Sequence, residues 1–179
     1  NRPNLGTNYP SPFDENYESE AISDPHCKMM YLAHENTKKL TILITSLSTL
    51  FSKVNGTNFF RKKIIDNNWL DAVIKFPSGG IQSSGISLVL LIIKKDRNND
   101  DKVQFIDFSE CKNISDSRVG LDIPKEEINK LYSIYKNKKQ NKISKLVSKL
   151  QIKTNDYQLN LHKYILSEEQ EAIGKLLSK

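Results

Sequence analysis

Ile86-Ser87-Leu88-Val89-Leu90-Leu91-Ile92-Ile93 is the stretch that decides the fold of this sequence, because it holds eight apolar or small residues in succession. A strand with one face in water alternates apolar and polar residues, whereas an uncharged run is typical of a strand covered on both faces. We therefore predict an interior strand near the centre of a sheet, with helices on both faces. Side chains alternate along a strand, so Val89 and Leu91 should point to one face and Leu88, Leu90 and Ile92 to the other.

The segments around this run alternate between strand and helix patterns. An Asn55-Gly56 turn leads into a helix with Phe59, Phe60, Ile64 and Ile65 on one face, and Asn67-Asn68 closes it. Strands are predicted at 41–47, at 69–76 up to the break at Pro77, and at 103–108. This order predicts an α/β fold with a sheet of about four strands and helices packed on it.

Helix-start signals mark the remaining elements. Asp24-Pro25 opens a helix to about residue 39, Asp122 to Glu127 opens another, and Ser167-Glu168-Glu169-Gln170 is a capping box for a last short helix. The expected organisation is an irregular N-terminal arm (1–24), an α/β domain (25–135) and a basic helical C-terminal extension (136–179).

Composition restricts the class of protein. The net charge of +6 permits a nucleic-acid partner, although a genome rich in A and T would favour the same Lys, Asn and Ile. Cys27 and Cys111 have no C-x-x-C spacing and the three histidines are scattered, so neither a metal site nor a disulfide framework is expected. With no signal-peptide pattern and no apolar stretch of membrane-spanning length, we expect a soluble cytoplasmic protein without a membrane partner.

Two segments are candidates for contacts with DNA. Residues 136–153 contain seven lysines and no acid, and Lys138, Lys139 and Lys142 could contact phosphates; the alternative is a solvated helix face, given the apolar positions 143, 146, 147 and 150. Between two predicted strands, Ser83, Ser84 and Gly85 could let the backbone approach a ligand closely. The alternative there is a flexible connection.

A series of motifs resembles the distal half of the N6-adenine DNA methylase domain, as in the modification subunit of type I restriction-modification systems. The motifs keep the family's order over about residues 25 to 166, and they are Leu50-Phe51, Asn55-Gly56, 61–77, 84–87, 90–95, 103–109, and 155–160 with Lys163-Tyr164.

The resemblance implies a partial Rossmann-like sheet of the S-adenosylmethionine-dependent methyltransferase type. In the family, the complete enzyme flips an adenine out of the duplex and moves a methyl group from S-adenosylmethionine to its N6 atom. The distal half supplies part of the sheet, part of the target-base side and surfaces for the specificity subunit.

This sequence departs from the family in its catalytic and cofactor motifs. The family's Asn-Pro-Pro-aromatic motif is not intact here; Asn8, Pro10 and Phe13 are candidates for a remnant, and a proline-rich loop without a role is the alternative. The seven glycines form no G-x-G-x-x-G, so we expect no cofactor-binding residues and no cofactor for this chain alone.

The resemblance therefore predicts a half-domain of a site-specific adenine methyltransferase that is inactive alone. Its expected partners are double-stranded DNA, the specificity and restriction subunits, or a complementary methyltransferase half. Two alternatives stay open. The chain could be a non-catalytic module that docks on a methyltransferase, a specificity subunit or DNA, or it could be one piece of a split enzyme.

Overall fold

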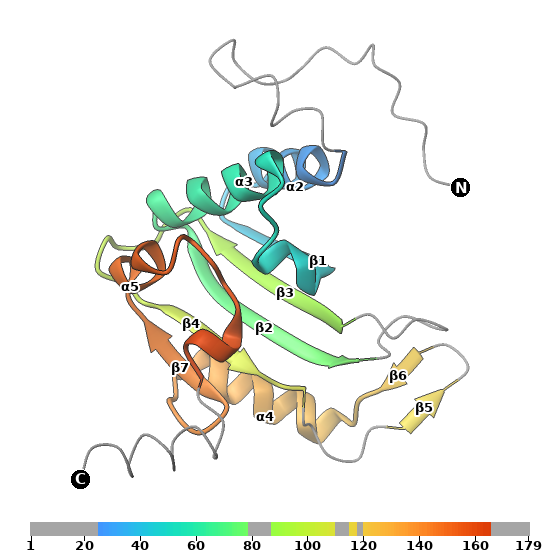
Figure 1. The fold of residues 1–179 in the computed structure, drawn as a ribbon. Coiled ribbons are helices and arrows are strands. Elements are labelled where there is room, and N and C mark those ends of the chain that lie inside the picture. Colours follow the sequence, from blue (N-terminus) through green and yellow to red (C-terminus); the bar gives the residue numbers. More distant parts are fainter. Residues whose placement is uncertain (1–24, 79–86, 110–114, 118–119, 166–179) are drawn as a thin grey trace, which may run out of the picture.

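The computed structural model describes residues 25–78, 87–109, 115–117 and 120–165. These residues form a mixed five-stranded sheet in the order β1-β3-β2-β4-β7, with helices packed on it (Figure 1). The strands are β1 (Leu40–Ser46), β2 (Leu70–Ser78), β3 (Ser87–Lys94), β4 (Val103–Asp107) and β7 (Ser144–Val147). The α/β prediction is confirmed, and the sheet has five strands where about four were expected.

Strand directions within the sheet are mixed. Strand β3 runs antiparallel to both β1 and β2, while β2 and β4 pair in parallel and β7 is antiparallel to β4. It follows that β1, β2 and β4 all point the same way, so their carboxyl ends lie at one edge of the sheet.

The apolar run from Ile86 to Ile93 contributes most of β3, which is an interior strand, as predicted. Strand β3 lies between β1 and β2, and its residues alternate between two apolar clusters. Val89, Leu91 and Ile93 are fully buried on one face, whereas Ile92 and the half-buried Leu90 belong to the other. The predicted assignment of side chains to faces is confirmed for these residues.

Three helices and the last described segment cover the first face. Helices α2 (Pro25–Glu35), α3 (Asn55–Asp66) and α5 (Lys149–Thr154) contribute apolar side chains to this cluster, together with η2 (Leu161–Lys163). Figure 1 shows α2 and α3 on one side of the sheet and α4 (Lys125–Lys136) on the other.

Among the described residues, the second face has only partial cover. Helix α4 packs Leu131 against Ala72, Ile74 and Ile106 of β2 and β4. The β1 side of this face stays exposed, with Leu40, Ile42 and Ile44 exposed by 46%, 54% and 69%. Because α4 lies over the opposite half of the sheet, the prediction that helices cover both faces of the apolar run is met only in part by the described residues.

The prediction of a helical extension beyond residue 136 is wrong for Ser144–Val147. These residues form β7, which pairs with β4 and buries Val147 in the core. The apolar spacing at 143, 146 and 147 fits a helix, but β4 offers an open edge, and the buried Ser144 hydroxyl accepts a hydrogen bond from Gln104 at 3.0 Å. Tertiary pairing overrides local pattern here.

Smaller differences concern where elements begin and end. Helix α2 ends at Glu35, four residues before the predicted end. It ends there because the side chains of Asn36 and Thr37 donate hydrogen bonds to the carbonyls of Leu32 and Ala33. The Asn55-Gly56 pair opens α3 instead of forming a turn before it. Strand β2 continues to Ser78, and the ladder with β3 shifts register around Pro77, which has no N–H to donate.

Two further strands, β5 (Ser115–Ser117) and β6 (Gly120–Asp122), pair antiparallel as a separate ribbon, and a 3-10 turn, η1 (Leu47–Leu50), follows β1. Among the described residues, no helix has the length and apolar character needed to cross a bilayer. The predicted arm at 1–24 and the capping-box helix from Ser167 lie outside the described residues.

Candidate functional site

A pocket opens at the carboxyl edge shared by β1, β2 and β4. In open α/β sheets, ligands bind outside the carboxyl ends of the strands. The pocket has a volume of about 310 Å³. Its walls come from η1, from the ends of β2 and β4, and from the η2 segment, and its lining residues are Leu47, Phe51, Lys75, Asp107, Asn160, Leu161 and His162.

An ion pair lies at the sheet side of this pocket. Lys75 on β2 and Asp107 on β4 are neighbours in the parallel ladder, and the Lys75 ammonium lies 3.4 Å from an Asp107 carboxylate oxygen. The other Asp107 oxygen accepts hydrogen bonds from the Ser109 backbone N–H, at 3.0 Å, and from the Ser109 hydroxyl. Both charged side chains keep about a quarter of their surface exposed, so the pair remains accessible from the pocket.

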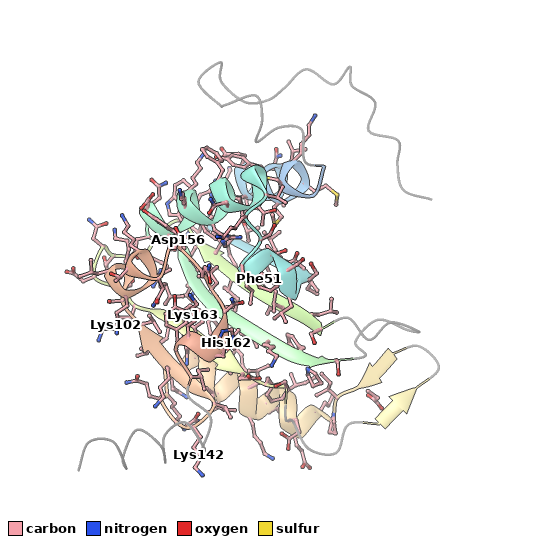
Figure 2. The ribbon with its side chains drawn as sticks, viewed as in Figure 1. Phe51, Lys102, Lys142, Asp156, His162 and Lys163 are labelled. Atoms are coloured by element: carbon pink, nitrogen blue, oxygen red, sulfur yellow. The ribbon has the colours of Figure 1, made fainter. Side chains whose placement is uncertain are left out.

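Two exposed side chains with rings, Phe51 and His162, lie at the rim of the pocket. Phe51 follows η1 and is 42% exposed, and His162 lies on η2 and is also exposed (Figure 2). A single exposed apolar side chain is common on protein surfaces, so Phe51 is of interest only because it lies at the pocket.

Segment 155–163 is held against the sheet by buried contacts. Leu159 is fully buried and its N–H donates to the Leu50 carbonyl at 2.9 Å, which fixes this segment beside η1. The Tyr164 ring packs 4.4 Å from Phe105 of β4, and burial raises the pKa of Tyr164 to about 12.

Arg61 of α3 ties the two walls of the pocket together. Its side chain is buried and donates to the carbonyls of Thr49 (2.8 Å), Ser52 (2.7 Å) and Tyr157 (3.2 Å). Burial of the guanidinium lowers the pKa of Arg61. A cation held by carbonyl oxygens from both walls fixes the distance between η1 and the 155–163 segment.

A second charged cluster lies at the opposite end of the sheet. A β-bulge in β2 turns Asp71 towards α4, where its carboxylate meets Lys94 at 3.1 Å, Arg97 at 3.3 Å and Lys138 at 2.9 Å. The Tyr135 hydroxyl donates to the same carboxylate at 2.6 Å.

The ionisation of this cluster follows from its contacts. Burial alone would raise the pKa of Asp71, but hydrogen bonds from Tyr135 and Lys138 outweigh it and the pKa is lowered. Burial lowers the pKa of Lys138, and the neighbouring charges of Lys94 and Arg97 act in the same direction. The cluster is an internal ion-pair network that joins α4 to the sheet.

The predicted DNA-contact lysines therefore divide into two groups. Lys138 pairs with the buried Asp71, whereas Lys139 and Lys142 have exposed side chains (Lys142 is labelled in Figure 2). The structure does not bring these residues to the carboxyl-edge pocket.

The remaining candidates lie outside the described residues. These are Asn8, Pro10 and Phe13 of the possible catalytic remnant, and Ser83, Ser84 and Gly85 of the β2–β3 connection. Since β2 ends at Ser78 and β3 begins at Ser87, that connection starts and finishes at the edge that holds the pocket. Within the described part of the chain, no group of three or more potential ligands could hold a metal ion.

Comparison with known proteins identifies the family. The N-6 DNA Methylase family model matches residues 14–172, which is most of the chain. The chain belongs to the N-6 DNA methylase family. The resemblance inferred from the motifs is thereby confirmed.

Individual relatives agree with this assignment. Over 112 residues the chain is 31% identical to the methylase subunit of the type I restriction enzyme MpnII from Mycoplasma pneumoniae. Its fold matches the type I restriction-modification methyltransferase subunit from Streptococcus thermophilus with a TM-score of 0.62 and 27% identity over 72% of the chain. A Vibrio vulnificus protein, assigned as a modification subunit of a type I restriction enzyme, shares the fold with a TM-score of 0.58 and 12% identity over 76% of the chain.

The chain spans only a part of these relatives. It covers 20% of the M. pneumoniae subunit, 26% of the S. thermophilus chain and 30% of the V. vulnificus chain. The activities and partners of the complete subunits therefore enter below as proposals.

The sequence patterns did not predict the residues that line the carboxyl-edge pocket. Lys75 and Asp107 could have been suspected from their charges, since each lies at the carboxyl end of a predicted strand. Phe51 and Asn160 were noted only as parts of motifs, and nothing local in the sequence shows that η1 and η2 face each other.

Proposed function

We propose that this chain is the distal half of an adenine-N6 DNA methyltransferase domain of the type I modification-subunit kind, and that the 179-residue polypeptide alone does not transfer methyl groups. The family match and the relatives from M. pneumoniae and S. thermophilus support the reaction class. Three parallel strands with an antiparallel β3 between two of them fit part of a Rossmann-like sheet.

The observation that carries this proposal is the open edge of β1 and its exposed apolar side chains. Strand β1 lies at the edge of the sheet and pairs only with β3 among the described residues. Three apolar side chains on the uncovered face of β1, Leu40, Ile42 and Ile44, are all more than 40% exposed. Leu90, the cross-strand neighbour of Ile44, is only half-buried. An apolar open edge of this kind favours pairing with another strand.

We propose that the cofactor-binding half of the methyltransferase occupies this edge. In the family that half holds S-adenosylmethionine and the Asn-Pro-Pro-aromatic motif, and the chain offers neither a glycine-rich loop nor an intact acceptor motif. The described residues therefore do not suit the cofactor by themselves. In this arrangement the carboxyl edge with its pocket would face the reacting groups, because the strands of the joined sheet that run parallel to β1, β2 and β4 all end there.

Partners outside the methyltransferase domain belong to the same proposal. Double-stranded DNA, a specificity subunit and a restriction subunit are the partners that membership of a type I system suggests, in the cytoplasm. A net charge of +6 and the exposed Lys139 and Lys142 support a polyanionic partner. These lysines also favour the second candidate function, a non-catalytic module that docks on DNA or on a specificity subunit and regulates it.

Complementation tests the main proposal. The chain would be co-expressed with the remaining part of the S. thermophilus methyltransferase subunit, and methyl transfer to DNA and co-purification would both be measured. We expect the two parts to co-purify and to methylate DNA together. We expect no methylation of DNA by either part alone.

Two variants sharpen the result. Ile44→Asp places a charge on the exposed β1 surface and should abolish co-purification while its melting temperature stays near that of the wild type. Ile128→Asp on α4, which is 49% exposed, is the matched control and should still co-purify. Methylation by the chain alone, or co-purification of Ile44→Asp, would contradict the proposal.

A further inference from the structure

A second pocket opens at the amino edge of the sheet, opposite to the carboxyl-edge pocket. It lies where β1 and β2 begin, includes the Asp71 cluster in its lining, and has a volume of about 730 Å³. We propose that this amino-edge pocket binds a compact dianionic phosphate group, either free phosphate or the monoester of a small molecule, between the ammonium groups of Lys94 and Lys138. This site is separate from the proposed function and does not depend on it.

The charges around Asp71 provide the first reason. Lys94, Arg97 and Lys138 all contact this one carboxylate, so three cations face one anion and two positive charges remain uncompensated. Burial lowers the pKa of Lys138, and repulsion by Lys94 and Arg97 acts in the same direction. A phosphate monoester carries a charge of about −1.5 to −2 at pH 7, which matches this excess.

The free donors of the two lysines provide the second reason. Lys138 meets one Asp71 oxygen at 2.9 Å and Lys94 meets the other at 3.1 Å, and both ammonium groups lie over the Tyr135 ring. An ammonium group has three N–H donors, so the printed contacts among the described residues leave at least one donor on each lysine. The two side chains are 35% and 37% exposed and line the pocket. Because both ammonium groups contact the same carboxylate, a single phosphate group can bridge them.

Arg97 contributes charge and fixes the pocket wall. Its side chain is only 3% exposed, and its guanidinium donates hydrogen bonds to the carbonyls of Asn68, Leu70 and Lys102. These bonds tie the connection between β3 and β4 to the start of β2 (Lys102 is labelled in Figure 2). The wall is therefore already formed in the unliganded chain, as is usual for small-molecule sites.

The outer lining of the pocket favours a small ligand over nucleic acid. Three acidic residues, Asp96, Asp100 and Asp101, line it at exposed positions, and the exposed Lys39 and Lys102 offset only part of their charge. A DNA backbone would bring a row of phosphates past these carboxylates, which would repel them. A compact monoester places its charge at the two ammonium groups alone. The volume of about 730 Å³ lies within the range of ligand pockets and leaves room for an organic group beside the phosphate.

The position of the pocket suggests a regulatory ligand. In open α/β sheets, the reacting groups lie at the carboxyl edge, so a ligand at the amino edge does not occupy the place of a substrate. A phosphate held by Lys138 and Lys94 would instead strengthen the connection between the end of α4 and the sheet.

Calorimetric titration of the 179-residue chain tests the proposal. The probes are inorganic phosphate, ribose 5-phosphate as a monoester, and dimethyl phosphate as a diester with a single charge, all at one ionic strength. We expect one site for phosphate per chain and competition between inorganic phosphate and ribose 5-phosphate. Dimethyl phosphate should bind at least about tenfold more weakly, because it lacks the second charge.

Variants of the two lysines locate the site. Lys94→Gln and Lys138→Gln should each weaken phosphate binding at least about tenfold, the loss expected for a hydrogen bond to a charged group. Lys138→Arg keeps the charge and should retain most of the binding. Lys136→Gln is the matched control, because Lys136 is exposed on α4 and lies outside the pocket lining, and it should bind like the wild type. Melting temperatures show which variants are folded.

Tighter binding of ribose 5-phosphate than of inorganic phosphate would support the site and assign it to a monoester, whereas equal affinities would support it and assign it to free phosphate. Absence of saturable phosphate binding, equal affinity for dimethyl phosphate, or binding that survives in Lys94→Gln and Lys138→Gln would overturn the inference. Displacement of phosphate by a short DNA duplex with 5′-hydroxyl ends would also overturn it. If Lys138→Gln does not fold, Lys94→Gln and the wild-type comparison with dimethyl phosphate decide the question.

Discussion

The ammonium of Lys138 lies 2.9 Å from a carboxylate oxygen of Asp71, a residue 67 positions earlier in the chain. Lys138 takes a left-handed backbone conformation (φ 48°) two residues after the end of α4, where glycine is the usual residue. The ion pair with Asp71 supplies a reason for a lysine at this position. It joins the end of α4 to the bulge at the start of β2.

Replacement of Asp71 should destabilise the protein strongly. Asp71→Asn leaves Lys94, Arg97 and Lys138 around a neutral amide, and loss of one partner from a buried ion pair costs about 3–5 kcal/mol of unfolding free energy. Urea denaturation measures the change. Asp100→Asn, at an exposed position near the cluster, is the control and should change stability by less than about 0.5 kcal/mol. Equal stabilities of the two variants would show that the network contributes little.

Stability should fall in mild acid because of His34. Its ring is buried 4.7 Å from the Trp69 ring, and burial, with the charge of Lys95, lowers the pKa of His34 to about 4. The unfolded chain, with a histidine pKa near 6.5, then binds a proton that the folded chain does not. The destabilisation therefore begins as the pH falls below about 6.5 and is complete near pH 4, and it amounts to at most about 3 kcal/mol.

Denaturation of wild type and His34→Phe between pH 4 and 7 would measure this effect. The variant should lose most of the pH dependence across that window, and His162→Gln, which removes an exposed histidine, should retain it. Identical pH profiles for His34→Phe and wild type would contradict the assignment.

DNA affinity should depend on Lys139 and Lys142. If both contact phosphates, the double replacement Lys139→Gln and Lys142→Gln should weaken binding and flatten the slope of log K against log salt by about two units. Lys138 is left intact because it pairs with Asp71. Lys130→Gln on α4, where the lysine pairs with Glu127, is the control. An unchanged slope would assign the lysine tract to a solvated surface.

The interior position of β3 predicts which leucine is critical. Leu91 is fully buried, so Leu91→Asp would bury an unpaired carboxylate and should cost several kcal/mol, enough to unfold a domain of ordinary stability. Leu90 is half-buried, so Leu90→Asp should be milder than the sequence pattern alone suggests. Circular dichroism and thermal melts would compare the two. A folded Leu91→Asp with an unchanged melting temperature would contradict the strand order.

The polypeptide should bind S-adenosylmethionine weakly. It contains no glycine-rich loop to place backbone N–H groups near the cofactor. Calorimetric titration should therefore give a dissociation constant weaker than about 1 µM, an affinity that corresponds to about 8 kcal/mol. Tighter binding would mean that other parts of the chain form a cofactor site.

The interior strand could be predicted from sequence because apolar residues point to both faces of β3 and no charge interrupts the run before Lys94. The β1 surface could not, since Leu40, Ile42 and Ile44 have the composition of a buried strand and differ only in lacking cover among the described residues. Strand β7 was missed because four residues cannot distinguish a helical period from a strand period when a neighbouring edge decides the outcome.

The site was less predictable than the fold. Lys138 looked like one lysine of a basic tract, and only the bulge at Asp71 reveals its partner. The pocket depends on segments 47–51 and 160–162, about 110 residues apart, which are joined by Arg61 through backbone carbonyls. Carbonyl groups are the same in every residue, so no sequence pattern marks such a contact.

The strand order also constrains how the chain acquires its fold during synthesis. Strand β3 pairs with β2 residues 9 to 23 positions away but with β1 residues 42 to 54 positions away. At a translation rate of roughly 5–20 residues per second, β1 leaves the ribosome roughly 2 to 10 seconds before the residues of β3 that complete it. Throughout that interval the edge of β1 that later pairs with β3 is open, so another strand that has already been synthesised can compete with β3 for the position beside it.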